Sequence, residues 1–217
     1  MTTRHKPRRR TATGPYFLIA AILLACGGVF LAVRPSPPPA IHVDARQPED
    51  GNRIRLTAAQ AATLAGPPGQ RPVSSILNVR KRMKYGEFVW DDAGVPAGPV
   101  WVRVDLEKQL ISVFRAGQEI GTAVILYGAS EKPTPTGQLK ILEKDRDHYS
   151  SLYEAPMPFT MRLTDDGVAI HGSDVRWGAA THGCVGVPLS FAARLFDQVK
   201  LGDPVVILPA TTPSKDS

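Results

Sequence analysis

From residue 99 onward, short stretches of alternating apolar and polar residues dominate the chain, a pattern typical of half-buried strands. The segments predicted as strands are Val100–Leu106, Leu110–Phe114, Glu119–Leu126, Gln138–Leu142, Val168–Ile170 and Val205–Leu208. Turns are predicted at Ala116-Gly117 and at the rigid sequence Pro133–Gly137. The pattern therefore predicts a mainly β, mainly antiparallel domain.

One helix is strongly predicted near the C-terminus. Ser190 is placed as its N-cap, and Gly202 can end it. Its apolar face, at helical spacing, consists of Phe191, Leu195, Phe196 and Val199. Upstream, two weaker helical patterns at Thr57–Ala65 and Ser74–Arg82 predict a small cap region over residues 54–98.

The N-terminus has the pattern of a membrane segment. A basic tail, residues 1–14, precedes the apolar run 15–33, which as a helix would span about 28 Å, enough for a bilayer core. Arg34 and a proline-rich stretch end the run, and the positive-inside rule keeps the tail in the cytoplasm. This predicts an uncleaved single-pass anchor in the inner membrane, a linker over residues 34–53 and a periplasmic domain. The alternatives are a cleaved signal peptide and a lipoprotein modified at Cys26.

The net charge of +6 belongs to this N-terminus. Six basic residues precede residue 35, no acidic residue precedes Asp44, and from residue 35 onward twenty basic residues face twenty acidic ones. A nucleic-acid-binding groove is therefore not indicated.

The second of the two cysteines, Cys184, lies in the predicted exported domain without a partner, which is unusual in an oxidising compartment. His171 and His182 precede it closely, and glycines flank all three residues. A thiol needs a base to attack as thiolate, and glycines leave backbone amides free to bind an oxyanion. The segment therefore carries the ingredients of acyl transfer.

Three other interpretations of these residues fit the sequence less well. An inert buried cysteine does not explain the two histidines. A zinc site with His171, His182 and Cys184 lacks a second thiolate. A papain-like order is excluded because no histidine follows Cys184.

The motif resembles the signature of the L,D-transpeptidase (YkuD-type) catalytic domain. In that family a His-Gly pair precedes Ser/Thr-His-Gly-Cys, an apolar residue and usually Arg, and here His171-Gly172 precedes Thr181–Val185. The resemblance covers residues 99–208 and includes the turn Thr134–Gly137 and the segment Met157–Leu163. It implies an L,D-transpeptidase-like β-sandwich with one packed helix, followed by a tail over residues 209–217.

The resemblance also implies roles for individual residues. Cys184 is expected to be the nucleophile and His171 its general base. His182 is expected to support the site, although it could simply shape the loop. The amides of Gly183 and Cys184 are expected to contribute to the oxyanion hole. No metal or cofactor is implied.

Positions around the base and the nucleophile complete the expected site. Gly172 and Ser173 lie beside the base, and Ser173 is expected to orient its ring through the backbone. Gly186 departs from the family pattern because it stands where most members carry Arg. The absence of this arginine puts acceptor specificity in question. Arg176 or Arg194 could supply a substitute charge.

The resemblance implies a peptidoglycan L,D-transpeptidase that is acylated by a stem tetrapeptide or by a carbapenem. The acceptor amine would be a neighbouring stem peptide, giving a 3→3 cross-link, or an envelope lipoprotein. An L,D-carboxypeptidase on the same fold is one alternative, and a non-catalytic wall-binding scaffold is another.

Overall fold

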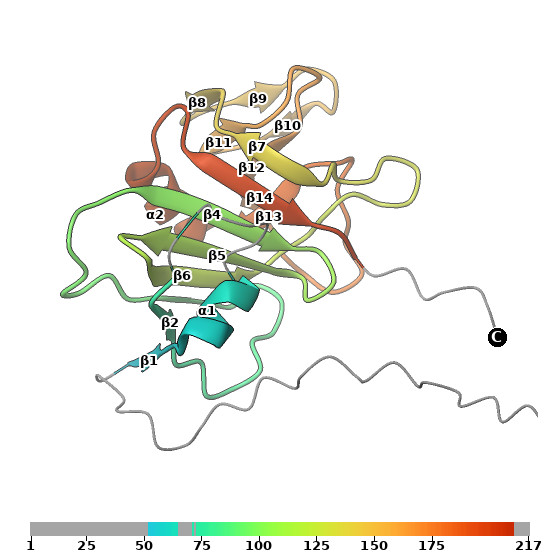
Figure 1. The fold of residues 1–217 in the computed structure, drawn as a ribbon. Helices are drawn as coiled ribbons and strands as arrows, with labels where there is room; N and C mark the ends of the chain where they lie inside the picture. Colours follow the sequence, from blue (N-terminus) through green and yellow to red (C-terminus); the bar gives the residue numbers. More distant parts are fainter. Residues whose placement is uncertain (1–51, 65–70, 72, 211–217) are drawn as a thin grey trace, which may run out of the picture. The chain divides into compact units, whose positions relative to one another are not determined.

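The structure, a computed structural model, describes residues 52–64, 71 and 73–210. Within these residues the chain is mainly β with two helices (Figure 1), which confirms the predicted fold class to that extent. The predicted basic tail, membrane segment and most of the linker lie outside the described residues. Among the residues described, no helix combines the length and apolarity needed to cross a membrane.

The larger of two main sheets has the strand order β1-β2-β6-β5-β4-β14-β7, with β3 also paired to β6. The strands are β1 Arg53–Arg55, β2 Ser75–Leu77, β3 Phe88–Trp90, β4 Val100–Asp105, β5 Leu110–Arg115, β6 Gln118–Val124, β7 Gly137–Lys140 and β14 Pro204–Leu208. The strands predicted between Val100 and Leu126, the turn at Ala116-Gly117 and the final strand at Val205–Leu208 are therefore confirmed. Their boundaries are shifted by one or two residues.

The smaller sheet has the order β13-β12-β11-β8, and β9 and β10 form a separate hairpin. The strands are β8 Glu143–Asp145, β9 Tyr149–Ser150, β10 Ala155–Pro156, β11 Thr160–Arg162, β12 Ala169–Ser173 and β13 Val185–Pro188. Most pairs are antiparallel as predicted, but β12–β13, β4–β14 and the short β2–β6 pairing are parallel. Parallel neighbours need a crossover, and residues 174–184 connect β12 to its parallel neighbour β13.

The main core lies between the two sheets and helix α2, Leu189–Gln198. The helix buries Phe191 and Leu195 completely, which confirms the predicted apolar face. The helix begins two residues earlier than predicted: Pro188 occupies the N-cap position without a side-chain hydrogen bond, so the prediction of Ser190 as the cap is wrong. The side chain of proline has no oxygen that could accept a hydrogen bond from the amides of the first turn.

The segment upstream of β4 belongs to the large sheet. Helix α1, Ala58–Leu64, confirms the first weak helix, whereas the second is wrong, because Ser75–Leu77 forms strand β2. Ser75 and Leu77 are buried on either side of the half-buried Ile76, and tertiary pairing with β1 and β6 overrides the weak local pattern. The two helices lie on opposite sides of the large sheet (Figure 1). The predicted boundary of a cap region at residues 54–98 stays a prediction.

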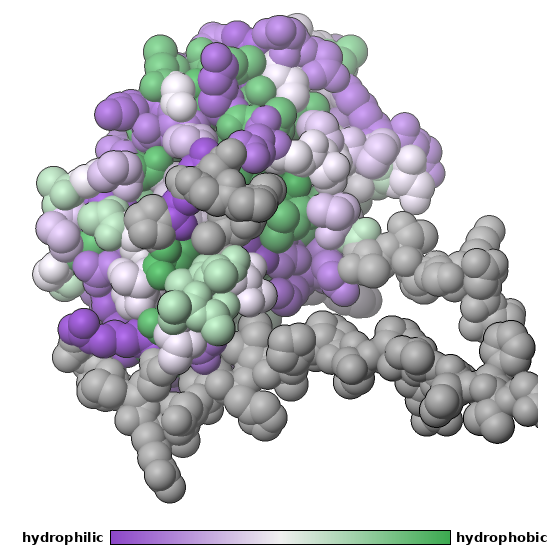
Figure 2. Space-filling view, viewed as in Figure 1, coloured by the Kyte–Doolittle hydropathy of each residue, from purple (hydrophilic) through white to green (hydrophobic). Residues whose placement is uncertain are grey.

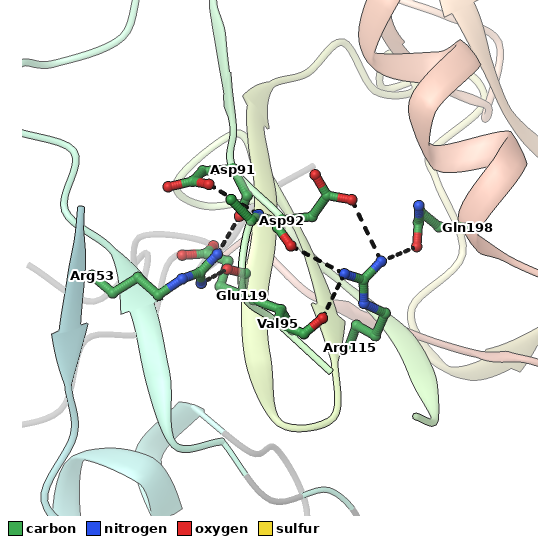
Figure 3. A network of polar contacts seen from close by, with 8 residues as sticks. Arg53, Asp91, Asp92, Val95, Arg115, Glu119 and Gln198 are labelled. Atoms are coloured by element: carbon green, nitrogen blue, oxygen red, sulfur yellow. Dashed lines mark hydrogen bonds and ion pairs between the residues drawn. The ribbon is translucent and has the colours of Figure 1, made fainter. Parts of the chain in front are cut away.

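Two arginines fasten this segment to the remainder of the sheet (Figure 3). The guanidinium of Arg53 donates to the backbone carbonyls of Glu119 and Asp91. Arg115 donates to the Val95 carbonyl at 2.9 Å and to Oε1 of Gln198, on α2, at 2.8 Å. Helix α1 itself buries no residue, and its exposed alanines form a pale green patch in Figure 2.

Candidate active site

Cys184 ends a tight turn directly before β13. Gly183 adopts φ of +100°, a conformation that side chains with a Cβ rarely adopt. The hydroxyl of Thr181 donates to the carbonyl of Cys184 at 2.5 Å and closes the turn. The thiol is 7% exposed and packs in a small cluster with Met157 and Ala169. The nucleophile predicted from the sequence is therefore desolvated.

A second loop supports the turn from behind. The amide of Gly128 donates to Oγ1 of the buried Thr134 at 2.8 Å, and the amide of Thr181 donates to the Tyr127 carbonyl at 3.0 Å. A Cβ at Gly128 would lie 2.2 Å from the carbonyl oxygen of Lys132 and 2.9 Å from the Cα of Gly183. The Thr-Pro-Thr-Gly turn is thus a structural support of the nucleophile loop.

His171 lies on β12, which runs parallel to β13 and places it in register with Gly186. Its Nδ1 lies 2.9 Å from the carbonyl oxygen of Gly172. A carbonyl only accepts hydrogen bonds, so Nδ1 carries the hydrogen and Nε2 of the neutral ring is free to take a proton. The contact is made by the carbonyl of Gly172, and the orienting role expected of Ser173 stays a prediction.

His171 and Cys184 line one cavity of about 600 Å³. The cavity also contains the other predicted site residues Gly172, Ser173 and His182. Gly172 lies in a tight position, because a Cβ there would be 2.9 Å from Cδ1 of Leu189. Gly183 is absent from the cavity lining but shapes the turn beneath it. The structure therefore brings the predicted nucleophile and the predicted base to the same cavity.

Burial shifts the pKa of both groups toward the neutral forms. Desolvation raises the pKa of the Cys184 thiol above its ordinary 9.0, although the Ala169 amide and the charge of Lys132 oppose the change. Desolvation lowers the pKa of His171 below its ordinary 6.5, opposed by its hydrogen bond to Gly172. At neutral pH the resting site therefore holds a thiol and an imidazole rather than a preformed ion pair. Attack on a carbonyl then requires transfer of the thiol proton to the base.

His182 lies beside this pair as part of a stack. Its ring lies 4.7 Å from the ring of Tyr153 at an interplanar angle of 16°. Nζ of Lys132 donates to the Tyr153 hydroxyl at 3.2 Å, which raises the pKa of Lys132. Sequence reasoning missed Tyr153 and Lys132, because they join segments whose proximity depends on how the loop between β9 and β10 folds over the site.

Cys184 also borders a second, smaller cavity of about 240 Å³. Its lining includes Lys132, Asp166 and His148, so it is more polar than the first. The thiol can therefore be approached from two sides. This arrangement suits a reaction in which one reactant forms a covalent intermediate and a second reactant reaches it by another path.

Gly186 packs against Ser173, and a Cβ there would lie 3.0 Å from the Ser173 Cβ. Neither Arg176 nor Arg194 lines the two cavities at Cys184 in the described part of the chain, so neither supplies the substitute charge there. Within residues 52–64, 71 and 73–210, no three histidine, cysteine or acidic side chains converge as metal ligands.

Comparison with known proteins identifies the domain that carries this site. The family model of the L,D-transpeptidase catalytic domain (YkuD) matches residues 99–207. L,D-transpeptidase 1 of Mycobacterium tuberculosis is 25% identical over 120 residues, which cover 48% of this chain and 48% of that protein. This chain thus spans about half the length of the curated relatives it matches.

Solved structures of similar chains are also named L,D-transpeptidases. An L,D-transpeptidase from Mycobacterium smegmatis is 22% identical, with a TM-score of 0.48 and coverage of 51% of this chain and 58% of that chain. An L,D-transpeptidase from Stackebrandtia nassauensis is 25% identical, with a TM-score of 0.47 and coverage of 52% and 57% respectively.

Proposed function

The chain belongs to the family of L,D-transpeptidase (YkuD) catalytic domains, and from this premise we propose that it is a peptidoglycan L,D-transpeptidase with Cys184 as nucleophile and His171 as general base. The observation that carries the proposal is the single cavity lined by a buried thiol and by an imidazole whose Nδ1 is tied to a carbonyl. A wall-binding scaffold would need neither a desolvated thiol nor a base beside it.

In the first half-reaction, Sγ of Cys184 attacks the carbonyl of the third, L-centred residue of a stem tetrapeptide while its proton passes to Nε2 of His171. The amides of Gly183 and Cys184 stabilise the developing oxyanion. The C–N bond to the terminal D-Ala breaks as His171 returns the proton to the departing amine. A thioester on Cys184 and free D-Ala result.

In the second half-reaction, an acceptor amine attacks the thioester carbonyl and gives its proton to His171. The thiolate leaves and regains that proton from the imidazolium. The two cavities that meet at Cys184 support this order, because an acceptor can enter by one side while the donor chain occupies the other. The acceptor is the side-chain amine of a neighbouring stem, giving a 3→3 cross-link, or a lysine of an envelope lipoprotein.

A second candidate function is hydrolysis of the same thioester. Gly186 favours it, because no cationic side chain stands at this position on β13 to hold an acceptor carboxylate. Water would then replace the amine, and the protein would act as an L,D-carboxypeptidase.

The N-terminal sequence supports a proposal for the place of the reaction. We propose that residues 15–33 anchor the chain in the inner membrane and that the catalytic domain acts in the periplasm. The supports are the uncharged length of this run and the basic residues that precede it.

Product analysis tests the proposal. The purified full chain in detergent is incubated with a disaccharide tetrapeptide, and the muropeptides are separated and weighed. Release of D-Ala with dimers joined through tripeptides supports transpeptidation, and tripeptide monomers alone support the carboxypeptidase. Equal product from Cys184→Ala would contradict the assignment of the nucleophile.

A further inference from the structure

The loop between β2 and β3 is strongly basic. Residues 80–84 read Arg-Lys-Arg-Met-Lys, and all four of their basic residues are exposed. Within the described part of the chain, the side chains of Lys81, Arg82 and Lys84 form no ion pair. The charge balance counted from residue 35 onward concealed this local excess.

A cavity of about 880 Å³ lies beside this loop and is larger than either cavity at Cys184. We name it the basic groove: its basic lining comprises Lys81, Arg82, Lys84, Arg103 and Lys108. Its floor is the face of the large sheet that points away from the main core, and Arg103, Ser112 and Thr122 project from β4, β5 and β6. The floor is therefore hydrogen-bonding rather than purely apolar.

The floor of the basic groove is held in place by buried polar contacts. Oε2 of Glu119 accepts the Leu77 amide at 2.8 Å, and Arg103 donates to Asp105 at 2.9 Å. Nε of Arg103 is buried without a hydrogen-bond partner among the described residues. These contacts leave the Nε hydrogen of Arg103 as an unused donor in the floor of the groove.

One wall of the basic groove is aromatic. The rings of Tyr85 and Trp177 meet edge to face, with centroids 5.5 Å apart, and the Tyr85 hydroxyl donates to Oε1 of Gln109 at 2.8 Å. Trp177 is nevertheless 82% exposed, so most of its surface is available. A fixed and open indole offers an apolar face to the C–H face of a sugar ring.

The wall also connects the basic groove to the active site. Trp177 lies in the segment between β12 and Cys184, and Asp174 of the same segment lines the catalytic cavity. The loop that carries the basic residues approaches this segment, because a Cβ on Gly86 would lie 3.3 Å from the Val175 carbonyl oxygen. Only a few residues, 174–177, separate the lining of the catalytic cavity from that of the basic groove. One linear polymer can therefore occupy both sites.

We propose that the basic groove binds a peptidoglycan strand outside the catalytic cavity, with a sugar on Trp177 and stem-peptide carboxylates on Lys81, Arg82 and Lys84. The inference rests on the proposed function, because it takes the polymer to be the substrate of the same protein. Exposed ion pairs contribute little singly and are screened by salt, so the binding is salt-sensitive and gains from several contacts on one strand.

An anionic membrane fits the same charges less well. Membrane docking requires protruding apolar side chains next to the basic ones. Of the exposed large hydrophobic residues in the described chain, only Trp177 lines the basic groove, and Met83 in the basic loop is half-buried. A concave site also suits a strand better than a flat bilayer.

The test uses the full chain in detergent, with Cys184→Ala as background so that substrate is not consumed. Sedimentation with purified peptidoglycan, freed of attached polymers, is measured for the triple variant Lys81→Ala/Arg82→Ala/Lys84→Ala and for Trp177→Ala. The matched control removes three exposed basic residues elsewhere, as Lys140→Ala/Arg194→Ala/Lys200→Ala. We expect the apparent Kd to rise about tenfold in the loop variant and less than twofold in the control. Equal loss in both triples, or loss in neither, would overturn the inference.

Lysine footprinting provides a measurement on the unsubstituted loop. Acetylation of Lys81 and Lys84 is followed by peptide mass spectrometry with soluble glycan strands or with micelles containing phosphatidylglycerol. Protection by the strands supports the inference, and protection by the lipid alone overturns it. Carbapenem acylation of the natural chain is measured separately, since its failure would count against the proposed function and leave the binding result standing.

Discussion

The catalytic cavity and the basic groove, which flank residues 174–178, differ in the charge and the burial of their lining residues. The catalytic cavity is lined mainly by uncharged residues, with Asp174 as its acidic member, and it holds a thiol that is 7% exposed. The basic groove carries five cationic residues in its lining, and three of them stand on an exposed loop. The catalytic cavity removes water from its reactive groups, and the basic groove keeps the three charges of its loop in water.

This difference assigns chemical reactivity to the catalytic cavity and the attraction of an acidic polymer to the basic groove. Desolvation changes the pKa of Cys184 and His171 and so determines which protonation states react. Solvated lysines and arginines leave the reacting atoms unchanged but attract an acidic polymer over a distance set by ionic strength. The two grooves should therefore respond to different perturbations.

The largest effect should come from His171→Ala, which removes the base from the catalytic cavity and leaves the basic groove unchanged. Without a base, the neutral thiol has no acceptor for its proton, and the rate of carbapenem acylation should fall by about 10²–10⁴-fold. The rate is read from intact mass over time, and peptidoglycan sedimentation checks that the basic groove still binds. Acylation within threefold of the natural rate would contradict the role of His171.

A further effect should come from pH. Because burial lowers the pKa of His171, the neutral base persists into acidic solution, and acylation should decline only below pH 6.5. The rate should stay nearly constant from there toward pH 9.0, since the thiol pKa is raised above that value. Strand binding should stay flat over this window, because lysine and arginine remain charged. An acylation midpoint above pH 7 would indicate a stabilised imidazolium and contradict the neutral pair.

The smallest effect should come from Tyr153, which stacks on His182 and accepts a hydrogen bond from Lys132. Tyr153→Phe keeps the ring and removes the hydroxyl, so acylation should change by less than about threefold. Tyr153→Ala also removes the stack and should slow acylation by about tenfold. If the two variants are equally slow, the hydroxyl rather than the ring supports the site.

Local patterns in the sequence predicted the elements whose packing is local in character. The apolar face of α2 and the hairpin of β4 and β5 repeat at their own structural periods, so periodicity identified them. The prediction of a helix at Ser74–Arg82 was wrong because the strand in this segment, Ser75–Leu77, has three residues, too few to show the alternation of a strand. Its strand depends on partners more than 40 positions away, as in the contact between Leu77 and Glu119.

The candidate site divides in the same way. Cys184 and His171 were predicted because their motif lies in one short stretch of the sequence and is chemically distinctive. Tyr153 and Lys132 carry no such signal, since their role arises only when the loop after β9 folds over His182. The basic groove was missed because a charge balance counted from residue 35 onward hides a run of five residues.

Intact mass spectrometry of the full chain, incubated with a stem tetrapeptide or with a carbapenem, tests the covalent mechanism most directly. We predict one adduct per chain, mapped to Cys184 by peptide analysis and missing from Cys184→Ala. A folded protein that forms no adduct while still releasing D-Ala, or an adduct on another residue, would contradict nucleophilic catalysis by Cys184.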